Sequence, residues 1–148
     1  MRSRSRLLLA IFAAVCLSGA LGGCTVVRNR YLLDSEAREL PLVARGKKLP
    51  PSVHWAWVYE DWYMEHTQRI TFEASLTDAR AFAKDIVQDK VIVGGASTVL
   101  GDAEHAGWKY ARDPLVETGS GFPGGYWVQV AVAPAGEKAH VWLYLSSQ

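Results

Sequence analysis

Alternating apolar and polar side chains predict four strands between residue 53 and the end of the chain. A repeat of two residues places successive side chains on opposite faces of a strand. In the second run, apolar Phe72 lies between polar Thr71 and Glu73, so one face is expected to be buried and the other wet. The last two runs are joined by a loop typical of a hairpin. The predicted strands are residues 53–59, 69–74, 126–133 and 139–146, with a turn at Glu60-Asp61 after the first and a hairpin loop over 134–138.

One main helix is predicted over residues 77–88. Thr77 stands where an N-cap residue is expected, and Asp78 lies in the first turn, where the helix dipole favours negative charge. The apolar side chains recur with the spacing of a helical stripe, and charged side chains occupy the opposite side. The stripe consists of Ala79, Phe82, Ala83, Ile86 and Val87.

Between this helix and the last strands the periodicity is weak. Residues 91–93 predict a short strand, and a glycine-rich loop is expected from Gly94 to Gly125. Residues 119–124 match the string G-x-G-x-x-G, but a dinucleotide site needs a helix start directly after the motif. Here Pro123 interrupts the motif and a strand follows, so no dinucleotide is expected. Long loops of this kind are nevertheless often functional.

The order of these elements predicts an α+β domain over residues 53–148. We expect a small antiparallel sheet of four to five strands with the main helix, about 77–88, packed on one face. Residues 24–52 are expected to form a tether, because three prolines interrupt any long helix. Within the tether, Asp34 or Ser35 is placed to cap a short helical turn that ends at Leu40, before Pro41.

The first 23 residues predict an export signal. Arg2, Arg4 and Arg6 precede an uncharged, largely apolar run over residues 7–23. The run ends in Leu21-Gly22-Gly23-Cys24, which resembles the lipobox of bacterial lipoproteins. This resemblance implies that the Cys24 thiol takes a diacylglyceryl group, that the signal peptide 1–23 is removed, and that palmitate-type chains anchor the protein in a membrane. Two alternatives stay open: the signal of a soluble secreted protein, and an uncleaved N-terminal membrane helix.

The lipobox resemblance also implies where the protein works. Cys16 would leave with the signal and Cys24 would carry the lipid, so the mature domain would have no free thiol. Thr25 follows the modified cysteine, which resembles the pattern of lipoproteins sent to the outer membrane. We therefore expect a lipid-anchored protein of the bacterial cell envelope: at the outer membrane if the source has two membranes, and otherwise on the outer face of the plasma membrane.

The net charge of the chain argues against nucleic acid as a partner. The chain has 16 basic and 15 acidic side chains, a net charge of +1. Without the three arginines of the signal, 13 basic side chains remain against 15 acidic ones, a net charge of −2. A charge this close to zero gives no reason to expect nucleic acid as a partner.

Catalytic and metal-binding motifs are weak. The sequence has no G-x-S-x-G nucleophile motif, and its four histidines form no H-x-H or H-x-x-x-H pair. Two clusters combine acids with histidine, Glu60-Asp61 with Glu65-His66 and Asp102-x-Glu104-His105, yet solvated turns have the same composition. No catalytic residue, metal or cofactor is therefore predicted, although an enzyme is not excluded.

The content of aromatic side chains is the most unusual feature. All six tryptophans and all six tyrosines follow Cys24, and the last two strands are apolar or aromatic on both faces. One helix covers only one face of a sheet, so the second face must be covered by the long loop, the tether or a partner. Turns and loops expose aromatic side chains more readily than strands do. The candidate binding residues are Trp62, Tyr63, Trp108, Tyr110 and Phe122.

These observations favour a non-enzymatic binding or structural module of the envelope, with a protein or a cell-wall component as its partner. A first alternative is an immunity or inhibitor protein that neutralises its partner at the membrane. A second alternative is a hydrolase that acts on an envelope polymer.

Overall fold

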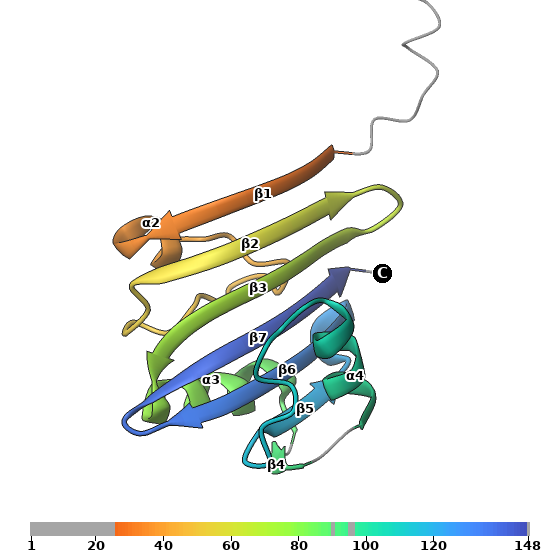
Figure 1. The fold of residues 1–148 in the computed structure, drawn as a ribbon. Helices are drawn as coiled ribbons and strands as arrows, with labels where there is room; N and C mark the ends of the chain where they lie inside the picture. The colour runs from red at the N-terminus through yellow and green to blue at the C-terminus, as the bar shows by residue number, and fades with distance from the viewer. Residues whose placement is uncertain (1–25, 90, 95–96, 148) are drawn as a thin grey trace, which may run out of the picture.

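The computed structural model describes residues 26–89, 91–94 and 97–147, and in this part of the chain seven antiparallel strands form one sheet. The strand order is β1-β2-β3-β7-β6-β5-β4 (Figure 1). The strands are β1 (Val26–Leu33), β2 (Trp55–Trp62), β3 (His66–Ser75), β4 (Ile92–Val93), β5 (Glu117–Gly121), β6 (Tyr126–Ala135) and β7 (Lys138–Ser147). The helices are α2 (Asp34–Arg38), α3 (Leu76–Val87) and α4 (Ser97–His105), with a 3-10 turn η1 (Pro123–Gly125). The architecture is α+β, with six strands of five or more residues rather than four to five.

The predicted strands are present, with one shifted turn. β2 continues through Glu60-Asp61 to Trp62, because both acidic residues pair with the neighbouring strands β1 and β3. The turn therefore lies at residues 63–65. The final hairpin, β6 and β7, agrees with the prediction, and the pairing of Ala135 with Lys138 leaves a tighter turn than expected.

The main helix begins one residue earlier than predicted. The Ser75 hydroxyl accepts a hydrogen bond from the backbone amide of Asp78 at 3.1 Å, so Ser75 caps α3 and Thr77 lies inside the first turn. The predicted apolar stripe is confirmed, because all five of its side chains are buried. These side chains are Ala79, Phe82, Ala83, Ile86 and Val87.

Two elements occupy the region that the sequence predicted as one long loop. α4 was missed because Gly101 lies inside it and, among residues 98–105, only Val99 and Ala103 are fully buried. β5 has the sequence Glu-Thr-Gly-Ser-Gly, which has low strand propensity. Its hydrogen bonds to β6 hold it in the sheet. The prediction of a continuous loop from Gly94 to Gly125 is therefore corrected.

Residues 26–52 belong to the domain instead of forming a separate tether. β1 pairs with β2 along its whole length, from Val26 opposite Trp62 to Leu33 opposite Trp55. α2 follows, as a short helix was predicted here, but neither Asp34 nor Ser35 caps it through its side chain. The segment 39–53 then crosses the sheet and buries five apolar side chains. These are Leu40, Leu42, Ala44, Leu49 and Val53.

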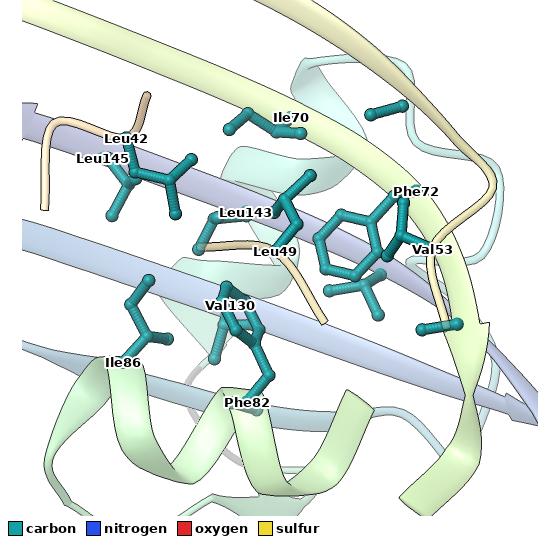
Figure 2. Packing of buried hydrophobic residues seen from close by; sticks show 14 of the residues in the cluster. Leu42, Leu49, Val53, Ile70, Phe72, Phe82, Ile86, Val130, Leu143 and Leu145 are labelled. Atoms are coloured by element: carbon teal, nitrogen blue, oxygen red, sulfur yellow. The ribbon is translucent and has the colours of Figure 1, made fainter. Parts of the chain in front are cut away.

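The segment 39–53 and α3 together cover one face of the sheet, here called the α3 face. Figure 2 shows Leu42, Leu49 and Val53 beside Leu145, Leu143 and Phe72 of the strands, with Phe82 and Ile86 of α3 on the same side of the sheet. Phe82 of α3 packs edge-on against Phe72 of β3, with ring centroids 5.7 Å apart. Since one helix is too narrow for seven strands, the apolar residues of the supposed tether complete this core.

The opposite face, the α4 face, is covered only over β5, β6 and β7. α4 and the loop 106–116 pack there in a second apolar cluster that includes Trp108 and Trp142. The Gln129 amide of β6 donates to the carboxylate of Asp102 on α4 at 2.8 Å. Both figures place α3 and α4 on opposite sides of the sheet. Among the residues that the structure describes, none therefore covers the α4 face of β1, β2 and β3.

The glycines of the G-x-G-x-x-G string have structural roles. A Cβ on Gly121 would lie 2.8 Å from the backbone oxygen of Val87, so only glycine lets β5 approach the end of α3. Gly124 has a φ of +61°, which the turn into β6 requires. No helix within residues 26–89, 91–94 and 97–147 has the length and apolar character to cross a membrane.

Candidate functional site: an aromatic groove on the α4 face

A groove of about 640 Å³ lies on the α4 face, between the open strands β2 and β3 and the loop that follows α4. We call it the aromatic groove. Seven of its fifteen lining residues are aromatic, and polar residues line it as well. Its aromatic residues are Trp55, Trp57, Tyr59, Phe72, Trp108, Tyr110 and Trp142, and its polar residues are Asn29, Arg69, Thr71, Lys109 and His140.

One wall of the groove is built by the turn that ends α4. The amide of Gly107 donates to the backbone oxygen of Glu104 and that of Trp108 to the backbone oxygen of Ala103, and Gly107 adopts a φ of +83° that reverses the chain. The Trp108 ring is buried and packs against Tyr110, with centroids 5.6 Å apart. Tyr110 stacks on His140 at 4.1 Å with nearly parallel rings. This wall is therefore rigidly packed against β7.

The other wall is an open row of rings on β1 and β2. Tyr31 on the rim lies 6.2 Å from Trp55 and 6.3 Å from Trp57 between ring centroids. Tyr31 is 56% exposed and Trp57 46% exposed. Large rings that remain this exposed on an ordered sheet mark interaction surfaces more often than isolated apolar residues do.

The charge of the groove is positive. The Arg69 guanidinium lies over the Tyr59 ring at 5.1 Å, and the Lys109 ammonium lies over Tyr110 at 4.9 Å. Both side chains belong to exposed residues, and neither makes a salt bridge within the described chain. The Glu73 carboxylate lies outside the lining, is paired with Lys138 at 2.7 Å and lies 3.7 Å from His140 of the groove. An anionic group would therefore be favoured in the groove.

A second hollow continues the groove on the far side of Arg69. Its volume is about 470 Å³, and it shares Arg69, Ala106 and Trp142 with the aromatic groove. Trp127 and Tyr144 add further aromatic surface to it. The two hollows meet at Arg69, and Asp102 adds a carboxylate to the second one. Two adjoining hollows suit a chain-like ligand.

The structure brings only two of the five predicted binding residues to the groove, Trp108 and Tyr110. Trp62 and Tyr63 lie at the turn between β2 and β3, and Phe122 lies between β5 and η1. The sequence prediction missed the strand residues Trp55, Trp57 and Tyr59. Their alternation was visible, but it did not reveal that Ala56 and Val58 are the buried side and the three aromatic residues the open side.

The acidic cluster around Glu60 has a structural role. Its buried carboxylate accepts hydrogen bonds from Arg30 at 2.8 Å and from Gln68 at 2.7 Å. Burial lowers the pKa of nearby His66 below 6.5, while Glu60, 3.7 Å away, opposes this shift. In the second cluster, Asp102 binds Gln129 and Glu104 binds Arg112. Within the described ranges, no three acidic, histidine or cysteine residues are grouped as metal ligands.

No protein-family model, curated protein or solved structure matches this chain. The predicted signal peptide and Cys24 lie outside the described residues.

Proposed function

We propose that this protein is a lipid-anchored binding module of the bacterial envelope, and that its aromatic groove binds an acidic glycan strand of the cell wall. The observation that carries the proposal is the open row of aromatic rings beside two unpaired cations. Export and anchoring are supported by the lipobox resemblance at Cys24.

A glycan suits this surface for three reasons. The ring faces of Tyr31, Trp55 and Trp57 offer flat apolar area for the C–H faces of sugars, while Asn29 and Thr71 offer hydrogen bonds to hydroxyl groups. Arg69 provides the planar fork that binds carboxylates. The second hollow, beyond Arg69, extends the site in the way that a polymer requires.

The proposal predicts that Trp57→Ala weakens binding of muramic-acid-containing glycan strands, freed of their peptides, by about tenfold or more, since each 1.4 kcal/mol corresponds to a factor of ten. Arg69→Gln should weaken binding of this acidic glycan but leave binding of a neutral N-acetylglucosamine oligomer unchanged. Titration calorimetry with both glycans measures these differences.

The matched control is Leu115→Ala, because Leu115 is also an exposed apolar residue and lies outside the groove. Its affinity should equal that of the wild type. If Trp57→Ala and Leu115→Ala bind both glycans equally well, the groove is not the glycan site. A protein captured through Trp57 in place of the glycan would favour the immunity or inhibitor alternative.

The anchor makes a separate prediction. Cys24→Ser should move the protein from the membrane fraction to the soluble fraction of expressing cells, because serine lacks the thiol that would take the lipid. Without acyl chains the domain has no stable attachment to the membrane. Fractionation with detection of the folded domain measures this. A Cys24→Ser protein that stays with the membranes as completely as the wild type was not held there by a lipid.

A further inference from the structure

Three chain segments meet at one end of the sheet. β1 begins there with Val26 opposite Trp62, at the end of β2. The turn between β2 and β3 lies directly beyond this pair, and β7 ends at the same place because Thr67 pairs with Ser146. Figure 1 shows the start of β1, this turn and the C-terminal end side by side.

The β2–β3 turn at this end is conspicuously apolar and exposed. Met64 is 87% exposed, Tyr63 71% and Trp62 48%. Trp62 stacks on His66 with ring centroids 3.4 Å apart, so its indole is held at the tip of the hairpin. A solvated turn would ordinarily consist of small and polar residues.

More exposed apolar side chains lie along the same end. Val26 and Val27 start β1, Trp127 is the second residue of β6, and Phe122 follows the last residue of β5. The register places these strand ends together, since Tyr126 of β6 pairs with Ser147 of β7. Seven of the twelve large apolar side chains exposed in the described residues are therefore at this end.

The lipid-bearing residue is covalently close to this end. Cys24 precedes Val26 by two residues, and an extended chain spans roughly 3.3–3.6 Å per residue. The Cys24 and Val26 Cα atoms are therefore within roughly 7 Å of one another in any conformation. An acyl group on Cys24 would hold this end of the sheet, and no other, against the bilayer.

We propose that this end of the sheet, led by Trp62 at the end of β2 and by Tyr63 and Met64 of the turn, inserts into the interfacial layer of the membrane that holds the Cys24 lipid. The proposal rests on the anchor of the proposed function. Tryptophan and tyrosine favour the interface because their rings are apolar and carry a polar group. The strands would then run away from the membrane, and the aromatic groove on the side of the sheet would face the surrounding envelope.

The test uses the full chain, produced in bacteria that acylate lipoproteins, with the intact mass reporting the lipid on Cys24. The protein is reconstituted into vesicles of phosphatidylcholine and phosphatidylglycerol with or without brominated acyl chains, which quench tryptophan emission at short range. Trp62→Phe should lose most of the quenching that the wild type shows. The matched control Trp57→Phe removes a tryptophan of nearly equal exposure from the groove. This variant should keep the quenching of the wild type.

A gain-of-signal variant completes the experiment. Met64→Trp adds an indole at the most exposed position of the turn and should increase quenching above the wild-type value. If the acylated protein shows the same quenching in wild type, Trp62→Phe and Met64→Trp, the membrane contact is refuted while the anchor stands. If Cys24 carries no lipid and the chain does not bind the vesicles, the anchor fails and the contact fails with it.

Discussion

A chain that starts at residue 53 will not fold, because it lacks the edge strand β1 and most of the segment that completes the core on the α3 face. Residues 26–52 contribute four buried leucines, Leu32, Leu40, Leu42 and Leu49. Burial of a leucine stabilises a protein by about 1.5–3 kcal/mol, so four contribute about 6–12 kcal/mol. This amount is comparable with the whole stability of an ordinary domain, about 5–15 kcal/mol. Circular dichroism during urea unfolding should show no cooperative transition.

The matched comparison is a chain that starts at residue 26, which should unfold cooperatively. Single variants refine the test. Leu40→Ala removes a side chain that is 2% exposed and should cost about 2–5 kcal/mol. Leu33→Ala changes a leucine that is 51% exposed and should cost about 0.5 kcal/mol or less. A cooperative transition in the chain from residue 53 would show that residues 26–52 are a tether after all.

Gln68→Leu will destabilise the protein by about 3 kcal/mol or more, although it exchanges one fully buried side chain for another of similar size. The Gln68 amide donates to the backbone oxygen of Pro41 at 2.8 Å and to Glu60 at 2.7 Å, and its oxygen accepts from the Val43 amide at 2.8 Å. Leucine leaves the Pro41 oxygen and the Val43 amide without this partner, and Glu60 keeps Arg30 as its hydrogen-bond donor. Each unsatisfied buried group costs about 1–3 kcal/mol.

Gln129→Leu is the matched control on the other face of the sheet. The Gln129 amide binds only Asp102 among the described side chains, and Asp102 is exposed, so water replaces the lost hydrogen bond. We expect a cost of about 1 kcal/mol for this variant. Urea unfolding of both variants measures the difference in their free energies of unfolding, and the slope of this free energy against urea concentration should be unchanged. Equal costs would mean that Gln68 does not hold the segment 39–53 against the sheet.

The buried network explains why the segment 39–53 was difficult to predict. Leu40, Leu42 and Ala44 are buried at a spacing of two, but Pro41 and Val43 between them are apolar as well, so the sequence shows no alternation of apolar and polar residues. The segment is an irregular strap whose backbone bonds go partly to a side chain, Gln68. Its prolines were interpreted as marks of a tether. In the structure they end α2 and shape the turn before Val53, and the leucines between them reach the core.

The prediction of the groove residues from the sequence has a similar limit. Trp108 and Tyr110 were predicted as binding residues because they lie outside regular strands, and the structure places both on the groove wall. Trp57 was not predicted, because alternation shows that a strand has two different faces but not which of them is covered. The decision depends on the segment 39–53, whose apolar side chains share one core with Ala56 and Val58 and leave the tryptophans on the other side.

The sequence by itself determined the elements whose information is local: the stripe of α3, the alternation of β2, β3, β6 and β7, and the N-terminal pattern that predicts export and a lipid on Cys24. Only the tertiary structure decided the pairing of β3 with β7, the place of β1 and β5, and the cover of each face. These features depend on contacts between residues far apart in the chain, and such contacts leave no period in the sequence. The same contacts decide that the β2–β3 turn lies beside the start of β1, next to the predicted lipid anchor.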